Sequence, residues 1–303
     1  LFRSRRTNFH LGSVVGLVLK RKYRLHIQYK QYPLFTKFKK FFGFECIICL
    51  VIKNVMKEVE PKIIFPDAFT ESTFVINKVE SRIELDDSQL QNISSNWQSF
   101  EEEAKLKGGQ VWDGTYYRLE NIDDISNELQ FSTIKYSTIR GLTHNQDLSS
   151  IPVQSRPNHI STATLIQTNE GLFVFGVRNK NSMSSKSIDL IGGGLQPEEL
   201  EVTNCKDIFE NQKKEMIEEL GIFDIHISSM KGLGITLSSK YNVIFIFLTK
   251  LSISKEELLL IFDKKTDDEM QGLEFIEETN LEQYLSDKGS YRPLTATLYF
   301  RNK

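Results

Sequence analysis

The sequence predicts an α/β protein, in which a layered domain with helices on both sides of a sheet spans residues 151–303 and follows a smaller α+β region over residues 56–150. Two observations predict the layered domain. Short runs rich in β-branched and aromatic residues alternate with helical segments along its length. One run, over residues 241–248, is continuously apolar, which is typical of a strand buried on both faces.

The region before residue 150 is expected to contain one helix and several short strands. The helix is predicted over residues 93–107, with Ser94 or Ser95 as its N-cap and Gly108-Gly109 as its end. The apolar face of this helix would consist of Trp97, Phe100, Ala104 and Leu106. Strands are expected at residues 63–65, 73–76, 116–119 and 131–139. The serines and prolines of residues 149–157 predict a linker.

The region after residue 150 begins with a predicted hairpin. Its strands, residues 161–167 and 172–177, are joined by the turn sequence Thr168-Asn169-Glu170-Gly171. Further strands are expected at residues 188–191, 241–248 and 273–276. Helices are expected at residues 206–220, 254–264, 280–286 and 292–300.

The composition is that of a globular protein in a reducing compartment. The 303 residues are 40% hydrophobic and 26% charged, and three cysteines are too few to staple a secreted fold of this size. Cys46 and Cys49 lie in an apolar run with no second pair to complete a zinc site. The longest mainly apolar run, residues 41–52, is shorter than the roughly 20 residues that span a bilayer. We therefore expect a cytoplasmic protein with no membrane partner.

The charge is distributed unevenly along the chain. Residues 1–55 carry a net charge of +11, with Glu45 as their one acidic residue, whereas residues 56–303 carry −13. The basic start is interpreted as a segment outside the folded unit, as an organellar presequence that would direct the protein to mitochondria, or as an anion-binding arm. The acidic remainder would repel phosphates, so no nucleic-acid partner is expected.

Three glutamates lie on one side of the helix expected over residues 206–220. At 100° per residue, Glu215, Glu218 and Glu219 fall within an arc of about 100°. The neighbouring arc, which would hold the helix against the sheet, consists of Phe209, Met216, Ile217 and Leu220. The glutamates repel one another, and a bound Mg²⁺ or Mn²⁺ would remove that repulsion. The alternative is a solvated acidic face.

The segment over residues 192–222 resembles the Nudix box, G-x5-E-x7-R-E-U-x-E-E-x-G-U, where U is aliphatic. Gly193 and Glu199 match its first half, and residues 214–222, which include Gly221, match its second half. Lys214 stands in the position of the arginine, so the charge is kept but the bidentate fork is lost. Fourteen residues, rather than seven, separate Glu199 from Lys214.

The resemblance implies a Nudix-type α/β/α sandwich with a mixed sheet. It also implies a hydrolase that uses water to cleave a nucleoside diphosphate linked to another group. Glu215, Glu218 and Glu219 would bind Mg²⁺ or Mn²⁺ together with the Gly192 carbonyl, and Glu215 and Glu219 would act in catalysis. A further catalytic carboxylate is expected from the later acidic loop, with Glu269 preferred; a solvated loop is the alternative.

A finer resemblance covers most of residues 95–303. The stretches over residues 112–119, 140–143 and 269–272 are similar to the branch that contains animal UDP-glucose/UDP-galactose pyrophosphatase and its plant relatives. That branch implies a nucleotide-sugar substrate, split into nucleoside monophosphate and sugar phosphate. The candidate substrate-binding residues are Tyr116, Arg118, Arg140 and Thr143. Trp112, Tyr116 and Tyr117 would either stack on the base or pack in the core.

Two other functions remain as alternatives. One is a nucleotide-sugar sensor that binds without catalysis, which the lysine substitution and the stretched box would favour. The other is a pyrophosphatase for ADP-ribose, dinucleotides or CoA. The sequence sets neither the base and sugar preference nor an oligomeric state.

Overall fold

The computed structural model describes residues 62–106, 109, 111–144, 148, 151–179, 188–265, 267 and 269–288. The chain separates into two units, Leu1–Glu58 and Val59–Lys303, and all described residues belong to the second. The expectations for residues 1–55, for the Cys46 and Cys49 pair and for the helix over residues 292–300 lie outside the described residues.

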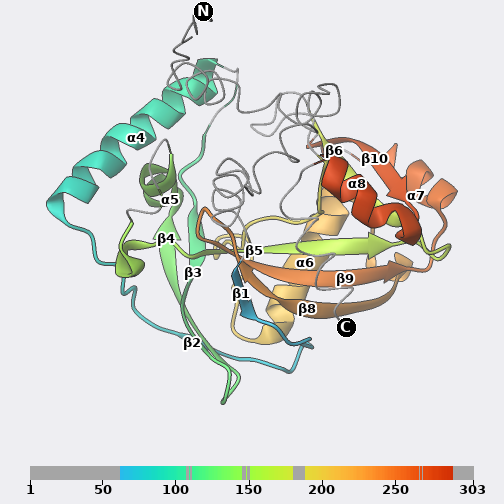
Figure 1. Cartoon of the computed structure of the whole chain (residues 1–303), viewed down its shortest axis with the longest axis horizontal. Coiled ribbons are helices and arrows are strands. Elements are labelled where there is room, and N and C mark those ends of the chain that lie inside the picture. Colours follow the sequence, from blue (N-terminus) through green and yellow to red (C-terminus); the bar gives the residue numbers. More distant parts are fainter. Residues whose placement is uncertain are drawn as a thin grey trace, which may run out of the picture. The chain divides into compact units, whose positions relative to one another are not determined.

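The described elements alternate between strands and helices (Figure 1). The strands are β1 (Lys62–Phe65), β2 (Val75–Lys78), β3 (Thr115–Asp123), β4 (Glu128–Lys135), β5 (His159–Gln167), β6 (Phe173–Arg178), β7 (Ile188–Asp189), β8 (Ile227–Leu237), β9 (Asn242–Leu251) and β10 (Met270–Ile276). The helices are α4 (Asp87–Leu106), α5 (Tyr136–Thr143), α6 (Cys205–Leu220), α7 (Lys255–Phe262) and α8 (Leu281–Lys288). Single 3-10 turns lie at η3 (Val153–Ser155), η4 (Asp224–His226) and η5 (Glu278–Asn280).

The ten strands form one mixed sheet. Its main path has the order β1-β8-β9-β5-β3-β4-β2, and β6 joins β5 to β7 and β10. The pairs β5–β9 and β2–β4 are parallel, while the other pairs are antiparallel. Strands from both sides of residue 150 therefore belong to the same sheet, and the division of the chain near that residue stays a prediction.

Helices cover both faces of the central strands. In β9, Phe245 and Phe247 pack in the cluster that contains Phe209 of α6, whereas Ile244 and Ile246 pack in the cluster that contains Leu281 of α8. Successive residues of a strand point to opposite faces, so the sheet separates α6 from α8. The predicted class, an α/β sandwich with a mixed sheet, is confirmed.

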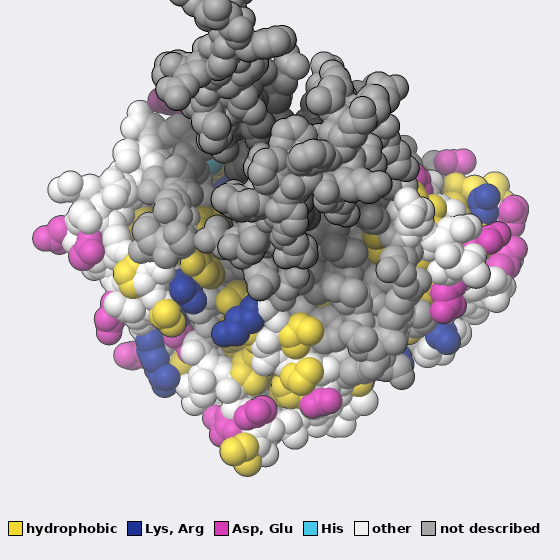
Figure 2. All heavy atoms as spheres, viewed as in Figure 1, with side chains coloured by type: hydrophobic (Ala, Val, Ile, Leu, Met, Phe, Trp, Pro, Cys, Tyr) yellow, Lys and Arg dark blue, Asp and Glu magenta, His cyan; other side chains and the backbone are white. Residues whose placement is uncertain are grey.

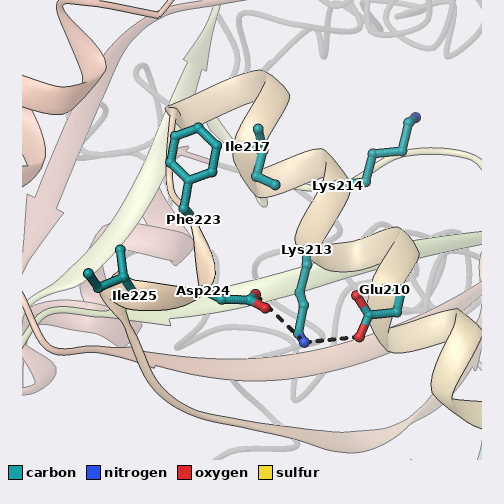
Figure 3. Close-up of a pocket in the computed structure, with 7 residues that line it drawn as sticks. All are labelled: Glu210, Lys213, Lys214, Ile217, Phe223, Asp224 and Ile225. Atoms are coloured by element: carbon teal, nitrogen blue, oxygen red, sulfur yellow. Dashed lines mark hydrogen bonds and ion pairs between the residues drawn. The ribbon is translucent and has the colours of Figure 1, made fainter.

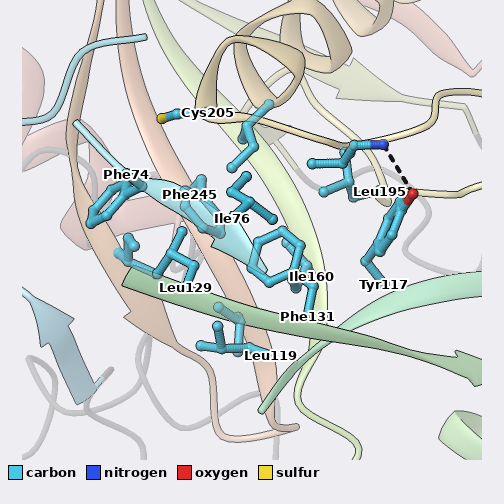
Figure 4. Packing of buried hydrophobic residues seen from close by; sticks show 14 of the residues in the cluster. Phe74, Ile76, Tyr117, Leu119, Leu129, Phe131, Ile160, Leu195, Cys205 and Phe245 are labelled. Atoms are coloured by element: carbon cyan, nitrogen blue, oxygen red, sulfur yellow. Dashed lines mark hydrogen bonds between the residues drawn. The ribbon is translucent and has the colours of Figure 1, made fainter. Parts of the chain in front are cut away.

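One hydrophobic cluster joins the two halves of the chain (Figure 4). Phe74 and Phe131, from before residue 150, lie in it with Ile160 and Phe245 from after that residue. Phe69, which is almost fully buried, packs edge-on against Phe209 and the two phenylalanines of β9, with ring centroids 5.3 to 5.8 Å apart. The region before residue 150 thus supplies part of the core under α6.

Acidic side chains gather at the edge of the molecule where α7 lies (Figures 1 and 2). This agrees with the net negative charge of residues 56–303. In the described part of the chain, no helix has the length and apolar character needed to cross a bilayer.

Two predicted elements differ from the structure. Helix α4 begins at Asp87, not near Ser94, because Asp86 Oδ1 accepts a hydrogen bond from Gln89 N (2.8 Å) and caps the helix earlier. Leu106, expected on its apolar face, is 90% exposed. The strand expected over residues 131–139 ends at Lys135, and α5 follows.

Contacts with residues distant in the sequence explain why residues 136–143 form a helix rather than a strand. Asp113 Oδ1 accepts a hydrogen bond from Ser137 N (2.7 Å) in the first turn of this helix. A Cβ on Gly141 would overlap the backbone of Ile93 in α4, so the two helices approach each other closely at this glycine. Packing on α4 therefore overrides the β-branched preference of the local sequence.

Candidate active site

Helix α6, predicted over residues 206–220, is confirmed and is capped at both ends. Asn204 Oδ1 accepts a hydrogen bond from Lys206 N (3.0 Å), and Asp207 Oδ2 accepts one from Asn204 N (3.0 Å). Gly221 ends the helix with a φ of 75°, and its N–H donates to Ile217 O (2.9 Å). These caps fix the length of the helix that carries the box glutamates.

The glycine segment, residues 192–194, lies directly against α6 and β3. Gly192 has a φ of 152°, and a Cβ there would overlap the carbonyl oxygen of Thr162. A Cβ on Gly193 would overlap the carboxylate of Glu215, and one on Gly194 would overlap the ring of Tyr116. The three glycines therefore let the chain pass close to a carboxylate and to an aromatic ring.

Glu219 is a buried carboxylate at the centre of this site. It is 2% exposed, and its Oε2 accepts a hydrogen bond from Gly192 N (3.0 Å). Its Oε1 is buried and has no hydrogen-bond partner among the described residues. Burial, followed by the charge of Glu269, raises the pKa of Glu219 to about 9, although Arg178 and the Gly192 N–H favour its charged form.

Glu215 is the second carboxylate that faces the glycine segment. Its side chain is 12% exposed, and burial raises its pKa to about 7 despite the nearby Lys214. Glu218, in contrast, has a half-exposed side chain and forms an ion pair with Lys214 (3.2 Å). The three box glutamates thus divide into two buried groups and one solvated group.

Lys214 lies among three carboxylates. Its Nζ is 2.6 Å from Glu199 Oε2, 3.2 Å from Glu218 Oε2 and 3.8 Å from Glu215 Oε1. The structure therefore brings together Glu199 and Lys214, the two halves of the box, in spite of the long stretch between them. The lysine that stands in the arginine position therefore pairs with glutamates of both halves of the box, through a single ammonium group rather than a bidentate guanidinium.

Arg178 connects the predicted loop carboxylate to the buried site. Its side chain is 13% exposed, and it forms ion pairs with Asp189 Oδ2 (3.0 Å) and with Glu269. The charge of Arg178 also acts on Glu219. Glu269, with a side chain that is 45% exposed, is thus held beside the buried carboxylates. Arg178 is not among the residues predicted from the sequence, although it lies at the end of β6, shortly before the glycine segment.

Two of the four candidate substrate-binding residues lie at this site. Tyr116 packs on Gly194 and lies 5.5 Å from Tyr136, centroid to centroid. Burial raises the pKa of Tyr116, and the charges of Glu199, Glu215 and Arg140 all act on it. The Arg140 guanidinium lies over the Phe100 ring, 4.2 Å from its centroid, and its Nε has no hydrogen-bond partner among the described residues.

The other four candidates differ in their contacts and exposure. Arg118 is 3% exposed and forms a buried ion pair with Glu120, and it also donates to Arg156 O (3.2 Å). Thr143 Oγ1 donates to Ile139 O (2.7 Å) within α5. Tyr117 is buried in the core and accepts a hydrogen bond from Val202 N (2.9 Å), while Trp112 is 60% exposed. The alternative of core packing therefore fits Tyr117 better than stacking on a base.

The outer face of α6 carries a hollow of about 430 Å³, which Lys214 also lines (Figure 3). Ile217, expected to pack against the sheet, is 38% exposed and lines this hollow with Phe223 and Ile225. That expectation was wrong, because Ile217 and Glu219 are two positions apart on the helix and point to nearly opposite sides. Lys213 bridges Glu210 (3.0 Å) and Asp224 (3.6 Å) across the hollow, away from the buried carboxylates.

The donor set fits a hard divalent cation. As placed, no three His, Cys, Asp or Glu side chains of the described residues form a preassembled metal-binding group. The Oε1 of Glu219 has no partner among the described residues, and the raised pKa of Glu219 and of Glu215 means that without a cation these buried groups favour their protonated forms. A cation bound there would take the place of the protons. Oxygen donors of this kind suit Mg²⁺ or Mn²⁺.

Comparison with known proteins gives matches to solved structures alone. No protein-family model matches the chain, and no curated protein matches it. The chain is similar to Tm1382, a putative Nudix hydrolase, with 14% identity over 67% of this chain and 97% of that one and a TM-score of 0.35. A Nudix hydrolase from Nitrosomonas europaea is 12% identical, over 47% of this chain and 88% of its own, with a TM-score of 0.31.

A third match is a bifunctional NMN adenylyltransferase/ADP ribose pyrophosphatase from Francisella tularensis, complexed with AMP and a Mn ion. It is 15% identical over 48% of this chain and 42% of its own, with a TM-score of 0.34. At these scores the likeness is partial, and the choice of a function depends on the site itself.

Proposed function

We propose that this chain is a Mg²⁺- or Mn²⁺-dependent hydrolase of the Nudix type that cleaves the diphosphate of a nucleoside diphosphate linked to a second group. The observation that carries the proposal is the pair of buried carboxylates, Glu215 and Glu219, on the helix face that meets the glycine segment. Glu219 has one oxygen bound to a backbone N–H and one oxygen with no partner among the described residues.

Buried like charges on one helix are costly unless a cation compensates them. A carboxylate loses its hydration on burial, and two carboxylates four positions apart repel each other. Arg178 and Lys214 each share their charge with other carboxylates, Asp189 and Glu269 for the arginine and Glu199 and Glu218 for the lysine. Without a cation the raised pKa values of Glu219 and Glu215 favour their protonated forms, and a divalent cation at Glu219 Oε1 would replace the proton and compensate the ionised carboxylates.

Each residue of the site has a role in the proposed reaction. Glu219 and Glu215 would hold the metal together with Glu218 and the Gly192 carbonyl, and Lys214 holds Glu215 and Glu218 in place. When bound, the metal would neutralise the diphosphate charge and lower the pKa of the attacking water. Glu269, held by Arg178 at the rim of the site, accepts the proton of that water. Water attacks one phosphorus, and the bridging P–O bond breaks.

The proposed substrate is a nucleotide sugar, in particular UDP-glucose or UDP-galactose, which would give UMP and a sugar phosphate. Tyr116, Tyr136 and Arg140 support a nucleotide at this place, because the charges of Glu199 and Glu215 act on Tyr116, which lies beside the Tyr136 ring, and the Arg140 guanidinium lies 5.8 Å from the centroid of that ring. Rings of this kind stack on a base, and a guanidinium binds phosphate or ribose oxygens.

The test is hydrolysis by the purified full chain, with Mg²⁺ or Mn²⁺, of a panel of UDP-sugars, ADP-ribose, dinucleoside polyphosphates and CoA. The expected result is release of a nucleoside monophosphate and a sugar phosphate from the UDP-hexoses. Cleavage of ADP-ribose or CoA alone would overturn the substrate but not the reaction. Tight binding of a UDP-sugar without turnover would favour a sensor, and no product from any compound would overturn the hydrolase.

A further inference from the structure

A single peptide of the glycine segment is held at both of its polar atoms by side chains of α6. Gln212 Nε2 donates a hydrogen bond to Ile191 O (3.2 Å), and Gly192 N donates one to Glu219 Oε2 (3.0 Å). Ile191 and Gly192 are consecutive, so these two bonds grip the peptide that joins them from opposite sides.

Gln212 and Glu219 are seven positions apart, which places them on one face of α6. Seven steps of 100° end about 20° short of two full turns, and they cover about 10 Å along the axis. The two side chains therefore converge on one peptide from positions two turns apart. The helix cannot slide along the glycine segment, or rotate over it, without breaking one of these bonds.

The hydrogen bond from Gln212 to the Ile191 carbonyl does not by itself account for the burial of Gln212. Gln212 is fully buried, and its Oε1 has no hydrogen-bond partner among the described residues. Ile191 O already accepts a hydrogen bond from Thr164 N (2.9 Å), so this carbonyl would be satisfied without the glutamine. A buried amide with an unpartnered oxygen costs stability that an apolar side chain of the same size would not cost.

We propose that Gln212 is a positioning residue of the metal centre. By fixing α6 on the Ile191–Gly192 peptide, it keeps Glu219 Oε2 on the Gly192 N–H and so keeps Oε1 available to the cation. The inference rests on the proposed function, because it assigns Gln212 a task in the metal site proposed above. Partners of this kind, which orient a metal ligand without touching the metal, typically change metal affinity by about 10- to 100-fold.

The test measures Mn²⁺ binding to the full chain, without substrate, by the EPR signal of the free ion. Gln212→Met keeps the length and burial of the side chain but removes the donor. The matched control is Asn211→Leu, since Asn211 is also fully buried and donates one bond, to Thr162 Oγ1 (3.1 Å), rather than to the glycine segment. We expect about 10-fold or greater weakening for Gln212→Met and less than about 3-fold for Asn211→Leu.

Activity supplies a second readout. With Gln212→Met, hydrolysis should return close to the wild-type rate at saturating Mn²⁺, because the ligands themselves are intact, whereas Glu219→Gln should not be rescued. Equal Mn²⁺ affinity for wild type and Gln212→Met, or equal weakening in both Gln212→Met and Asn211→Leu, would overturn the proposal. Gln212→Leu is the reserve variant, and failure of both substitutions at residue 212 to fold would assign it a structural role instead.

The design separates this inference from the proposed function. If wild type binds Mn²⁺, Glu219→Gln does not, and Gln212→Met binds like wild type, the metal site stands and the role of Gln212 fails. If wild type binds no Mn²⁺, or Glu219→Gln binds it equally well, the proposed function fails and the role of Gln212 fails with it.

Discussion

Glu218 and Glu219 are neighbours in the sequence but lie in opposite environments. The side chain of Glu218 is half exposed and shares Lys214 with other carboxylates, whereas Glu219 is 2% exposed. A solvated carboxylate keeps its hydration, while a buried one must find compensation from hydrogen bonds, from a nearby cation or from a proton. The two residues should therefore respond very differently to the same substitution.

Glu219→Gln should leave the protein folded and remove metal-dependent activity. Gln has nearly the size and helix propensity of Glu, and burial already favours the neutral form of Glu219, so the fold should be kept. Metal stabilisation of the transition state is worth several kcal/mol, so the rate should fall by at least about 100-fold. Thermal melting with and without Mg²⁺, together with turnover, measures both effects.

Glu210→Gln is the matched control, since Glu210 lies on the same helix but pairs with Lys213 at the outer hollow. Its rate and its Mg²⁺-induced shift in melting temperature should match wild type. If Glu219→Gln kept more than about a tenth of the wild-type rate, a loss below about 1.4 kcal/mol, Glu219 would not be a metal ligand.

The metal-free protein should lose stability as the pH rises. Burial raises the pKa of Glu219 to about 9 and that of Glu215 to about 7, from an ordinary value of 4.5. A carboxyl group with a raised folded pKa stabilises the fold fully below its unfolded pKa, and this contribution is lost as the pH rises through the folded pKa. The urea midpoint in chelator should therefore fall between about pH 5 and pH 9, as the pH passes from the unfolded pKa to the two folded pKa values.

The comparison for this pH effect is Glu219→Gln, whose urea midpoint should fall less over the same interval. Added Mg²⁺ should restore the wild-type midpoint at the alkaline end, because a cation favours the charged carboxylates. A midpoint that rises with pH in chelator would show that these two groups are not held in a desolvated site.

At the level of elements, the glycine segment lies between strand β5 and the carboxylates of α6. Its backbone reaches β5, where Thr162 N donates to Gly193 O (2.9 Å), and its other side meets the carboxylates. A side chain at each of its glycines would meet a different group. Substitutions at these positions can therefore test stability and metal binding separately.

Gly193→Ala should weaken metal binding more than it weakens the fold. The new Cβ would overlap the end of the Glu215 side chain, which can swing away at small cost, and Gly193 does not have a positive φ. Displacing a ligand in this way should lower Mn²⁺ affinity by about 10-fold, with a small change in melting temperature. Mn²⁺ titration and thermal melting of the same sample measure the two effects.

Two further alanine variants serve as comparisons for Gly193→Ala, one expected to be more destabilising and one expected to be neutral. Gly192→Ala should lower the melting temperature more, because its Cβ would overlap backbone and its φ is 152°. Gly272→Ala in β10 should change neither property, since its Cβ would meet no atom within 4 Å. A larger melting-temperature loss for Gly193→Ala than for Gly192→Ala would contradict the proposed division of roles.

Elements with strong local signals were predicted well, and those set by distant contacts were not. Helix α6 was found because a helical period ends at a glycine that the structure places at a φ of 75°. Strand β8 was not predicted, since its glycines, Gly232 and Gly234, interrupt the pattern at a β-bulge. The local sequence of α5 predicts a strand, and the helix forms because its start depends on Asp113 and its packing on Gly141.

The same distinction applies to the candidate site. The spacing of Glu215, Glu218 and Glu219 leaves a solvated acidic face open, and their assignment as metal ligands and that of Glu269 as a catalytic carboxylate depend on the family resemblance and stay predictions. Arg178 and Gln212 were missed because their importance comes from pairing across the sheet and from burial, neither of which is written in local sequence. A polar residue at a core-facing helix position, such as Gln212, was the available signal.

At the scale of the whole molecule, the described residues on both sides of residue 150 share one sheet and one core. Strand β1 pairs with β8, and β3 pairs with β5. We therefore expect the fragment 59–303 to fold and to hydrolyse substrate like the full chain, and the fragment 151–303 to remain unfolded or to aggregate.

Far-UV circular dichroism and cooperative thermal melting distinguish these outcomes. Loss of β1 to β4 would expose one side of β5 and the cluster around Phe69 and Phe131, and an exposed strand edge with an apolar surface favours aggregation. A fragment 151–303 that melts cooperatively and binds Mn²⁺ would show that the division near residue 150 separates two independent domains.

The pairing of β1 with β8 also bears on how the nascent chain reaches its fold. Ile63 pairs with Thr236, so the ribosome must synthesise most of the protein before β1 has its neighbour. At a synthesis rate of about 5–20 residues per second, this wait lasts on the order of ten seconds. During that time Phe65 and Phe69 have no β8 to cover them, which makes the emerging chain a substrate for chaperones that bind exposed apolar segments.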